Sequence, residues 1–320
     1  MLEELEKAYK YCEKITKVHA KSFYFAARFL PAEKQKAVYP IYAFCRHIDD
    51  EIDEIGAGNE TDAIAAVENW RAALEEVYFN AKRQRNGEAK QQIERQIKAD
   101  ENGLENQFQK SKSDERNLVF TAWEDLLKKY KIPRNLPLEL MRGVLQDTRV
   151  KRYETFDDLY VYCYRVASTV GLMSSEILGY SDAAALEYAE AMGIAMQLTN
   201  ILRDVKEDAA MNRIYLPQED LSRFDVSEKQ IFANEFGENF IRMMKFQVER
   251  ARDYYARGEK GIRLLEKDSR FTVLLASRIY SKILDEIEKQ NYNVFKRRAH
   301  TSKRQKMLAI PLIWLSAKKI

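Results

Sequence analysis

The chain has 320 residues, of which 53 are basic and 50 acidic, so that its net charge is only +3. A surface with such balanced charge is not typical of a nucleic-acid binder, and we expect no nucleic-acid partner. Hydrophobic residues make up 46% of the sequence, whereas Gly and Pro number only 11 and 6. This composition predicts a single all-α domain over residues 1–320 rather than a sheet protein rich in turns.

Helical periodicity with few breaker residues predicts a succession of helices along the chain. Pro31 stands where proline favours the start of a helix. Three further prolines, Pro133, Pro137 and Pro217, are expected to mark loops. The predicted helices cover residues 2–20, 32–55, 60–80, 114–130, 137–148, 155–179, 182–209, 227–267 and 269–291.

The three cysteines are scattered and form no CxxC motif, which predicts buried thiols in a reducing compartment. The N-terminal residues are acidic and amphipathic, unlike a signal peptide. No apolar run approaches the roughly 20 residues that span a bilayer. These features predict a cytoplasmic location, with peripheral attachment at the inner membrane surface as an alternative.

Residues 81–116 differ from the rest of the chain, since they are polar, nearly devoid of aromatic residues and interrupted by Gly87 and Gly103. We interpret this segment as a charged insertion, either a solvated helical hairpin or a mobile loop. A role in binding a partner is the alternative interpretation.

The C-terminal tail, residues 303–320, places an apolar stretch from Leu308 to Leu315 between basic flanks. The stretch is too short to span a membrane. Two interpretations remain open. The tail lies on an anionic membrane surface with Trp314 at the level of the headgroups, or it packs on the domain.

An acidic pair lies beside an apolar stripe in the segment IYAFCRHIDDEIDE, which begins at Ile41. Asp49 and Asp53 are four residues apart, so their carboxylates share one face of the predicted helix. That face borders the apolar stripe. Carboxylates this close repel one another and raise one another's pKa unless a cation joins them.

A second acidic segment, QLTNILRDVKEDAAMNRIYLP, repeats the pattern. Asn200, Asp204 and Asp208 follow one another at i+4 steps along one ridge of the predicted helix, and Gln197 precedes them by a turn. This ridge also borders an apolar stripe.

Oxygen ligands on two helical ridges suit Mg²⁺, which keeps several waters and takes phosphate oxygens from a substrate. Two such ridges facing each other across a bundle would hold a diphosphate through bridging metal ions. Arg46, Arg203 and Arg213 adjoin the ridges and would neutralise the remaining charge. A single DxxxD motif is common on a solvated helix face. Two such motifs, each beside an apolar stripe, are harder to explain as solvated surface. A di-iron site is the chemical alternative, and its Glu-x-x-His signature is missing from the sequence.

The sequence resembles the squalene/phytoene synthase family in these segments and in three others. HAKSFYFAARFLP, YAFCRHIDDEID, YVYCYRVASTVGLM, QLTNILRDVKEDAAMNRIYLP and SRIYSKILDEIEKQNYNVFKRRAH match the family's blocks in order and spacing. The resemblance covers nearly the whole chain except residues 81–116 and the extreme tail. It implies an isoprenoid synthase-type helical bundle with a central apolar cavity. It also implies a prenyltransferase that uses Mg²⁺, with Mn²⁺ as an alternative, and joins two prenyl diphosphates head to head.

The resemblance also implies roles for individual residues. Both metal motifs are intact, and their metal ligands would be Asp49, Asp53, Asn200, Asp204 and Asp208. The four aspartates would also be catalytic. Tyr162 would lie near the reacting carbons, where an aromatic ring stabilises a cation. The residues expected to contact substrate are His19, Lys21 and Ser22 at the mouth of the cavity, and Tyr42, Arg46, Gln197, Asn200, Arg203, Arg213, Tyr280 and Arg297 around the diphosphate. Those expected to set the chain length are Ala26, Ala27 and Gly171.

Small side chains at Ala26 and Ala27 leave room for a long prenyl chain, which favours C20 substrates and phytoene as the product. A squalene or dehydrosqualene synthase acting on C15 substrates is the alternative, and only a squalene synthase would need NADPH. A prenyl diphosphate phosphatase and a non-catalytic binding protein on the same fold are further alternatives. The intact aspartates argue against the binding protein.

Overall fold

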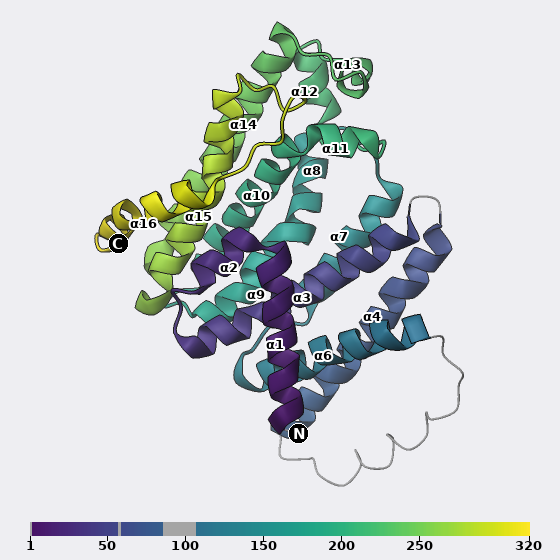
Figure 1. Ribbon diagram of the computed structural model, residues 1–320, viewed down its shortest axis with the longest axis vertical. Helices are drawn as coiled ribbons and strands as arrows, with labels where there is room; N and C mark the ends of the chain where they lie inside the picture. The colour runs from purple at the N-terminus through teal and green to yellow at the C-terminus, as the bar shows by residue number, and fades with distance from the viewer. Residues whose placement is uncertain (1, 57–58, 86–106) are drawn as a thin grey trace.

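The protein is built from packed helices, as the ribbon in Figure 1 shows. The computed structural model describes residues 2–56, 59–85 and 107–320. Within these ranges, β-structure is limited to two isolated bridges, which confirms the all-α prediction. The helices are α1 (Leu2–His19), α2 (Lys21–Ala27), α3 (Ala32–Ile55), α4 (Glu60–Arg85), α6 (Gln107–Lys129), α7 (Asn135–Arg149), α8 (Phe156–Cys163), a π-helical segment (Tyr164–Ser168), α9 (Thr169–Leu178), α10 (Ala185–Arg203), α11 (Val205–Ala210), α12 (Gln218–Arg223), α13 (Glu228–Phe232), α14 (Glu238–Lys260), a 3₁₀ turn (Ile262–Leu264), α15 (Lys267–Lys289) and α16 (Lys303–Ala317).

Two prolines differ in their consequences for the helices. Pro31 is the N-cap of α3, as expected at a helix start. Pro137 lies in the first turn of α7 and not in a loop, so this part of the loop prediction was wrong. The first turn tolerates proline because its missing N–H has no intrahelical partner there.

Three predicted helices are divided in the structure. Residues 155–179 form α8, the π-helical segment and α9, while residues 182–209 form α10 and α11 with Asp204 at the junction. Residues 227–267 form α13 and α14, with Asn234 in the left-handed region and Gly237 in an extended conformation between them. Hydrophobic periodicity continues across all three breaks, which is why it did not reveal them.

The π-helical segment packs closely against α10. A Cβ atom on Gly193 would lie only 2.4 Å from the Cα of Ser168, so glycine is required for this approach. The Oγ of Ser168 donates a hydrogen bond to the carbonyl oxygen of Glu190 at 2.8 Å. The segment that follows Tyr162 is thereby fixed against the helix that carries the second acidic motif.

Three clusters of buried hydrophobic residues hold the helices together. The first joins α1, α3, α4, α6, α7 and α9 in the lower half of Figure 1, and the second joins α8, α10, α11, α14 and α15 in the upper half. A smaller third cluster joins α2, α15 and α16. The three cysteines, Cys12, Cys45 and Cys163, are buried in the first two clusters and unpaired, as the prediction of buried thiols requires. The first acidic motif belongs to a helix of the first cluster and the second motif to helices of the second.

The predictions for the insertion and for the tail have different outcomes. Residues 81–85 continue α4 and α6 begins at residue 107, so most of the predicted insertion at 81–116 lies outside the described residues. The tail forms α16, with Ala309 and Ile313 buried in the third cluster. One face of the tail therefore packs on the domain. Along the part of the chain that the structure describes, no helix is both long and apolar enough to span a bilayer.

Candidate active site

The first acidic motif lies in the second half of α3. Burial, together with the charges of Asp147 and Asp53, raises the pKa of Asp49 to about 8. Arg46 opposes this shift, but its guanidinium is engaged with Asp50, to which its Nε donates at 2.9 Å. Burial also raises the pKa of the nearby Tyr42 hydroxyl. Asp49 thus lacks a cationic partner that would fully compensate for its burial beside other carboxyl groups.

The second motif extends over the junction of α10 and α11. Asp204, at the junction, receives two pairs of hydrogen bonds, from Arg203 at 2.7 and 2.6 Å and from Arg298 at 2.7 and 2.9 Å. Burial alone would raise the pKa of Asp204, but these two guanidinium groups outweigh it and lower the pKa. Asp204 is therefore ionised and already paired.

Asp208, one turn further on, is in the opposite situation. Burial and the charges of Asp204 and Asp147 raise its pKa to about 7, and Arg213 counteracts this only partly. Asp208 and Asp49 are therefore two carboxyl groups, on different helices, that lack a full counter-charge. Both would gain from a bound cation.

A hydrogen-bonded group on α10 and α15 brings together four of the residues expected to contact the diphosphate. The Tyr280 hydroxyl donates to the Oδ1 of Asn200, and the Nδ2 of Asn200 donates to Gln197 at 3.0 Å. Arg203 donates to the Tyr280 hydroxyl at 3.4 Å. These bonds fix the orientation of the Asn200 amide beside the paired Asp204.

Asp147, at the end of α7, is a site residue that the sequence analysis missed. Its two carboxylate oxygens accept hydrogen bonds from the hydroxyls of Tyr162 and Tyr215, each at 2.8 Å. The two tyrosine rings are stacked, with centroids 5.1 Å apart, and Tyr153 packs against both. Burial raises the pKa of Asp147, although the two hydroxyls and Arg213 oppose the shift. A lone aspartate at the end of an amphipathic helix gives no sequence signal of this arrangement.

Asp147 links the two motifs electrostatically. Its charge contributes to the raised pKa of Asp49 on α3 and of Asp208 on α11. The charge of Arg213 opposes the rise in the pKa of Asp147 and of Asp208. Asp53 in turn contributes to the raised pKa of Arg213. Asp147 therefore acts on one carboxylate of each motif.

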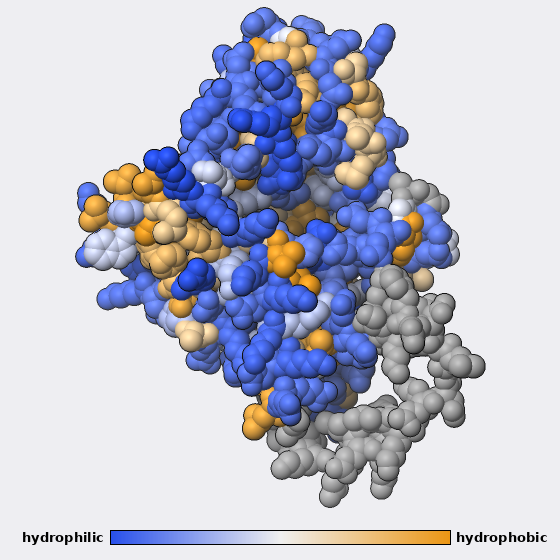
Figure 2. All heavy atoms as spheres, viewed as in Figure 1, coloured by the Kyte–Doolittle hydropathy of each residue, from blue (hydrophilic) through white to orange (hydrophobic). Residues whose placement is uncertain are grey.

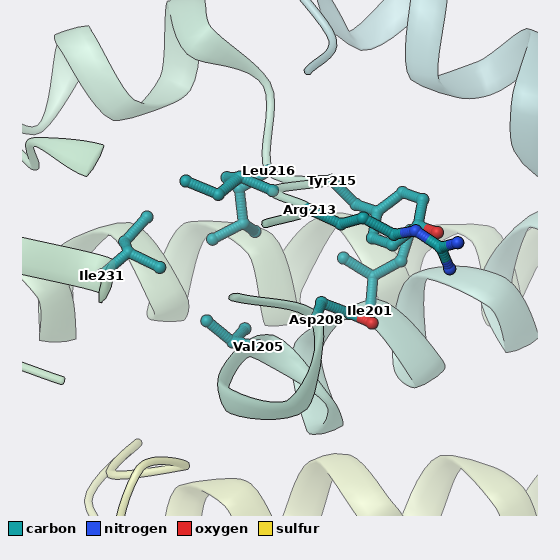
Figure 3. Close-up of a pocket in the computed structure, with 8 residues that line it drawn as sticks. Ile201, Val205, Asp208, Arg213, Tyr215, Leu216 and Ile231 are labelled. Atoms are coloured by element: carbon teal, nitrogen blue, oxygen red, sulfur yellow. The ribbon is translucent and has the colours of Figure 1, made fainter. Parts of the chain in front are cut away.

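Arg213 reaches this region from the loop after α11. Its Nε is buried and, among the residues that the structure describes, has no hydrogen-bond partner. A pocket of about 190 Å³ lies beside it, with the polar ends of Asp208, Arg213 and Tyr215 on one side and apolar side chains on the other (Figure 3).

The residues expected at the mouth of the cavity lie where α1 meets α2. His19 and Lys21 are exposed. Ser22 accepts a hydrogen bond from the Nζ of Lys306 on α16 at 2.7 Å. Arg297 is also exposed, and its charge contributes to the lowered pKa of Glu286. Its neighbour Arg298 instead pairs with Asp204. Arg298 is thus a second residue of the site that the sequence analysis missed.

The three small residues expected to set the chain length occupy different surroundings. Ala26 is buried in the cluster formed with α15 and α16, whereas Ala27 is buried in the cluster that contains α3. Gly171 lies at the crossing of α9 and α10, where a Cβ would come within 3.2 Å of the carbonyl oxygen of Ala189. Ala26 and Ala27, adjacent in α2, thus pack into two different clusters, and the role of the three residues in chain length stays a prediction.

The donor set fits a hard cation that is shared with a ligand. Within the described ranges, no three His, Cys, Asp or Glu side chains converge closely enough to hold an ion by themselves. The uncompensated carboxyls of Asp49 and Asp208, with the amide oxygen of Asn200, are the oxygen donors that Mg²⁺ prefers. Mg²⁺ is usually held by one or two carboxylates plus substrate phosphate oxygens, which agrees with this arrangement.

Comparison with known proteins shows which family the chain belongs to. The family model described as squalene/phytoene synthase matches residues 16–305. The 15-cis-phytoene synthase of Synechococcus elongatus is 35% identical over 99% of this chain and 95% of its own length. Phytoene synthase 2 (chloroplastic) of Solanum lycopersicum is 34% identical over 97% of this chain and 91% of its own.

Solved structures have the same fold. A dehydrosqualene synthase, crystallised with a ligand, superposes with a TM-score of 0.80 and 28% identity over 99% of both chains. A squalene synthase from Alicyclobacillus acidocaldarius superposes with a TM-score of 0.72 and 24% identity over 91% of this chain and 96% of its own, a likeness of fold. With the family model spanning most of the chain and the phytoene synthases above 30% identity, the protein belongs to the squalene/phytoene synthase family.

Proposed function

We propose that the protein is a prenyltransferase that condenses two molecules of geranylgeranyl diphosphate head to head to form phytoene. The observation that carries the proposal is the region around Asp147, whose charge contributes to the raised pKa of Asp49 in the first acidic motif and of Asp208 in the second. A diphosphate with its cations is the ligand whose charges would complete this region. The similarity to phytoene synthases of cyanobacteria and plants supports phytoene as the product.

Residues of both motifs would hold Mg²⁺, or Mn²⁺ in its place, together with the diphosphate oxygens: Asp49, Asp53, Asn200, Asp204 and Asp208. The bound cations would stabilise the negative charge of the departing diphosphate. Asp204 is already paired with Arg203 and Arg298, so its part includes the positioning of these two guanidinium groups. Arg213, with its unpaired Nε, would contact the diphosphate directly.

The reaction would proceed in two halves. In the first, one prenyl diphosphate ionises and releases its diphosphate, the allylic cation alkylates the double bond of the second, and loss of a proton closes the ring of a cyclopropylcarbinyl diphosphate. In the second, this intermediate ionises and rearranges, and loss of a proton completes phytoene. The stacked rings of Tyr162 and Tyr215 would stabilise the cations through their faces. Asp147 holds both tyrosine hydroxyls in position.

The length of the substrate is the finer part of the proposal. The expectation of C20 substrates rests on the small side chains of Ala26 and Ala27, which are buried in two packed clusters. Dehydrosqualene synthesis from two C15 diphosphates is the second candidate, because a solved dehydrosqualene synthase superposes over 99% of both chains. NADPH would be needed only for squalene.

Product analysis tests the proposal. Purified protein with Mg²⁺ is offered C15 and C20 diphosphates separately, with and without NADPH, and the products are extracted and identified. We expect a C40 hydrocarbon from the C20 substrate, independent of NADPH. A C30 hydrocarbon alone would move the assignment to dehydrosqualene or, if it requires NADPH, to squalene. Release of prenyl alcohol alone would indicate a phosphatase, and binding without turnover a non-catalytic protein.

A further inference from the structure

The loop after α11 carries two side chains of the site on one extended segment. Arg213 and Tyr215 are two residues apart, so they point to the same side of the segment, as Figure 3 shows, and Leu216 points to the other. The hydroxyl of Tyr215 is fixed by its hydrogen bond to Asp147. The Nε of Arg213 is buried without a partner within the described part of the chain. The place of the Arg213 guanidinium therefore depends on how firmly the backbone of the loop is held.

The peptide unit between Asn212 and Arg213 is held at both edges. The N–H of Arg213 donates to the carbonyl oxygen of Asp208 at 2.9 Å. The carbonyl oxygen of Asn212 accepts a hydrogen bond from the guanidinium of Arg152 at 2.8 Å. Because a peptide unit is planar, two bonds on opposite edges fix its orientation. Arg152 thus fixes the plane from which the side chain of Arg213 departs.

Asn212 lies in a backbone conformation that benefits from this support. Its φ is +58°, in the left-handed region that asparagine tolerates better than most residues. Arg152 donates to the side-chain Oδ1 of Asn212 as well, at 3.2 Å. One planar guanidinium therefore holds both oxygens of Asn212, which the single ammonium group of a lysine would not reproduce.

The guanidinium of Arg152 is itself held by several partners. Its Nε donates to Glu228 of α13 at 2.7 Å, and the same carboxylate oxygen accepts a hydrogen bond from Gln218 at 2.9 Å. Another of its nitrogens donates to the carbonyl oxygen of Lys151 at 2.7 Å. Since Glu228 balances its charge, Arg152 contributes a fixed geometry rather than a free positive charge.

Arg152 reaches the loop from the surface of the molecule. Its guanidinium carbon lies 5.3 Å from the centre of the Phe232 ring, and Phe232 is 40% exposed. Figure 2 shows pale orange spheres at the upper right of this face, where Figure 1 places α13, the helix that ends at Phe232. The partners of Arg152 are therefore those of the outer side of the loop, and Arg213 extends from the loop toward Asp208 (Figure 3).

The segment that carries Arg152 also connects the loop to Asp147. The N–H of Ile214 donates to the carbonyl oxygen of Lys151 at 3.0 Å, and Arg152 and Ile214 form an isolated parallel bridge. This segment directly follows α7, in whose last turn Asp147 lies. Arg152 therefore fixes the loop relative to both Asp147 and the second acidic motif.

We propose that Arg152 is a positioning residue that holds the guanidinium of Arg213 in place for the diphosphate, without touching the substrate itself. The inference rests on the proposed function, because it names what orients one cationic group of that site. Without Arg152, the carbonyl oxygen of Asn212 would lose its donor and the loop would move more freely. Arg213 would then have to be ordered during binding, which weakens the binding of the diphosphate.

A double-mutant cycle tests whether Arg152 acts through Arg213. Calorimetry measures the binding of geranylgeranyl thiodiphosphate with Mg²⁺ to wild type, Arg152→Met, Arg213→Met and the double variant. We expect Arg152→Met to bind roughly ten-fold more weakly and Arg213→Met roughly ten- to hundred-fold more weakly. The double variant should bind no more weakly than Arg213→Met, because residues that act in series are not additive. Losses that multiply in the double variant, or wild-type binding by Arg152→Met, would overturn the proposal.

Arg250→Met is the matched control. Arg250 also joins a carboxylate, that of Asp220 at 2.6 Å, and its guanidinium lies 4.1 Å from the centre of the Phe156 ring. Its side chain is 16% exposed, compared with 24% for Arg152, so its loss should lower the unfolding temperature at least as much. We expect Arg250→Met to keep wild-type affinity for the thiodiphosphate. An equal loss of affinity in both variants would reduce the role of Arg152 to general stability and refute the proposal.

Hydrogen exchange examines the loop directly and needs no ligand. Arg152→Met should accelerate exchange of the Arg213 amide, whose partner is the carbonyl oxygen of Asp208, whereas Arg250→Met should not. Unchanged exchange in Arg152→Met would contradict the proposal. If Arg152→Met does not fold, Arg152→Lys takes its place in both measurements with the same direction of change expected.

The two proposals fail in different ways. Phytoene formation by wild type, together with wild-type affinity of Arg152→Met for the thiodiphosphate, would refute the role of Arg152 alone. Absence of turnover by wild type, together with faster exchange of the Arg213 amide in Arg152→Met, would refute the proposed function. The structural link from Arg152 to Arg213 would then stand without it.

Discussion

Asp49, Asp204 and Asp208 have identical side chains, but their pKa values are shifted in different directions. Asp204 faces two guanidinium groups that lower its pKa, while burial and neighbouring carboxylates raise the pKa of Asp208 to about 7 and of Asp49 to about 8. The difference comes from the partners and not from the spacing of the residues in the sequence. In consequence Asp49 and Asp208 are the groups whose ionisation a bound cation would change most.

The stability of the metal-free protein should therefore fall as pH rises. A carboxyl group whose pKa is raised by folding holds a proton in the folded state that it loses in the unfolded state above about pH 4, so its favourable contribution is lost as pH rises toward its folded pKa. For Asp49 and Asp208 this window extends from about pH 4 to about 8. Between pH 6 and 8.5, the free energy of unfolding of Asp49→Asn should therefore decline by about 1–2 kcal/mol less than that of wild type.

Urea unfolding with a chelator present, at both pH values, measures this effect. Asp285→Asn, on the exposed side of α15, serves as the control and should keep the wild-type pH dependence. Parallel pH dependences for wild type and Asp49→Asn would show that the Asp49 pKa is not raised by folding.

We expect the hydroxyl of Tyr162 to have a role distinct from that of its ring. Tyr162→Phe keeps the ring but removes the donor to Asp147, and should lower kcat by roughly 100-fold with little change in KM. Tyr254→Phe is the control, since Tyr254 packs with Phe156 and Tyr160 in a neighbouring aromatic group. Steady-state kinetics with radiolabelled diphosphate gives both constants. A rise in KM at unchanged kcat would assign the hydroxyl to binding instead.

At the scale of the elements, the break between α10 and α11 gives the aspartates of the second motif different surroundings. Asp204 lies outside both helices, where Arg203 and Arg298 reach it from two sides, and Asp208 follows on a separate short helix. A continuous helix would have kept Asn200, Asp204 and Asp208 on one ridge. The break divides their roles between a paired carboxylate and an uncompensated one.

Two adjacent arginines give a direct test of this arrangement. Both side chains are exposed, but Arg298 pairs with Asp204, whereas the charge of Arg297 contributes to the lowered pKa of Glu286. Arg298→Ala should lower kcat/KM by roughly ten-fold or more, as expected for loss of a charge-assisted pair, and Arg297→Ala by much less. Kinetic constants of the two variants at one Mg²⁺ concentration suffice. A larger loss for Arg297→Ala would mean that Arg297 contacts the diphosphate in the complex.

The same elements show what could be predicted from the sequence. The bounds of α3 and the apolar face of that helix follow from local periodicity and from Pro31, and both motifs were found from spacing alone. Asp147, Arg298 and the π-helical segment could not be found in this way, because each depends on contacts between residues distant in sequence. Tyr215, for example, reaches Asp147 across 68 positions. The roles carried over from the family for individual residues stay predictions until the variants are measured.

On the scale of the whole molecule, the site lies where helices of two hydrophobic clusters meet. Asp49 comes from a helix of the first cluster, Asp208 from a helix of the second, and Asp147 influences both. Burying several carboxylates together destabilises a protein unless a counter-charge is supplied. A diphosphate with its cations would therefore join the two halves as well as position the substrate.

The most direct test of this account is calorimetric binding of geranylgeranyl thiodiphosphate, in which a bridging sulfur prevents ionisation. We predict that wild type binds it only with Mg²⁺, and that Asp49→Asn and Asp208→Asn each weaken binding by roughly ten- to hundred-fold. Asp285→Asn should bind as wild type does. Mg²⁺-dependent binding that survives in either variant at wild-type strength would contradict a single site shared by the two motifs.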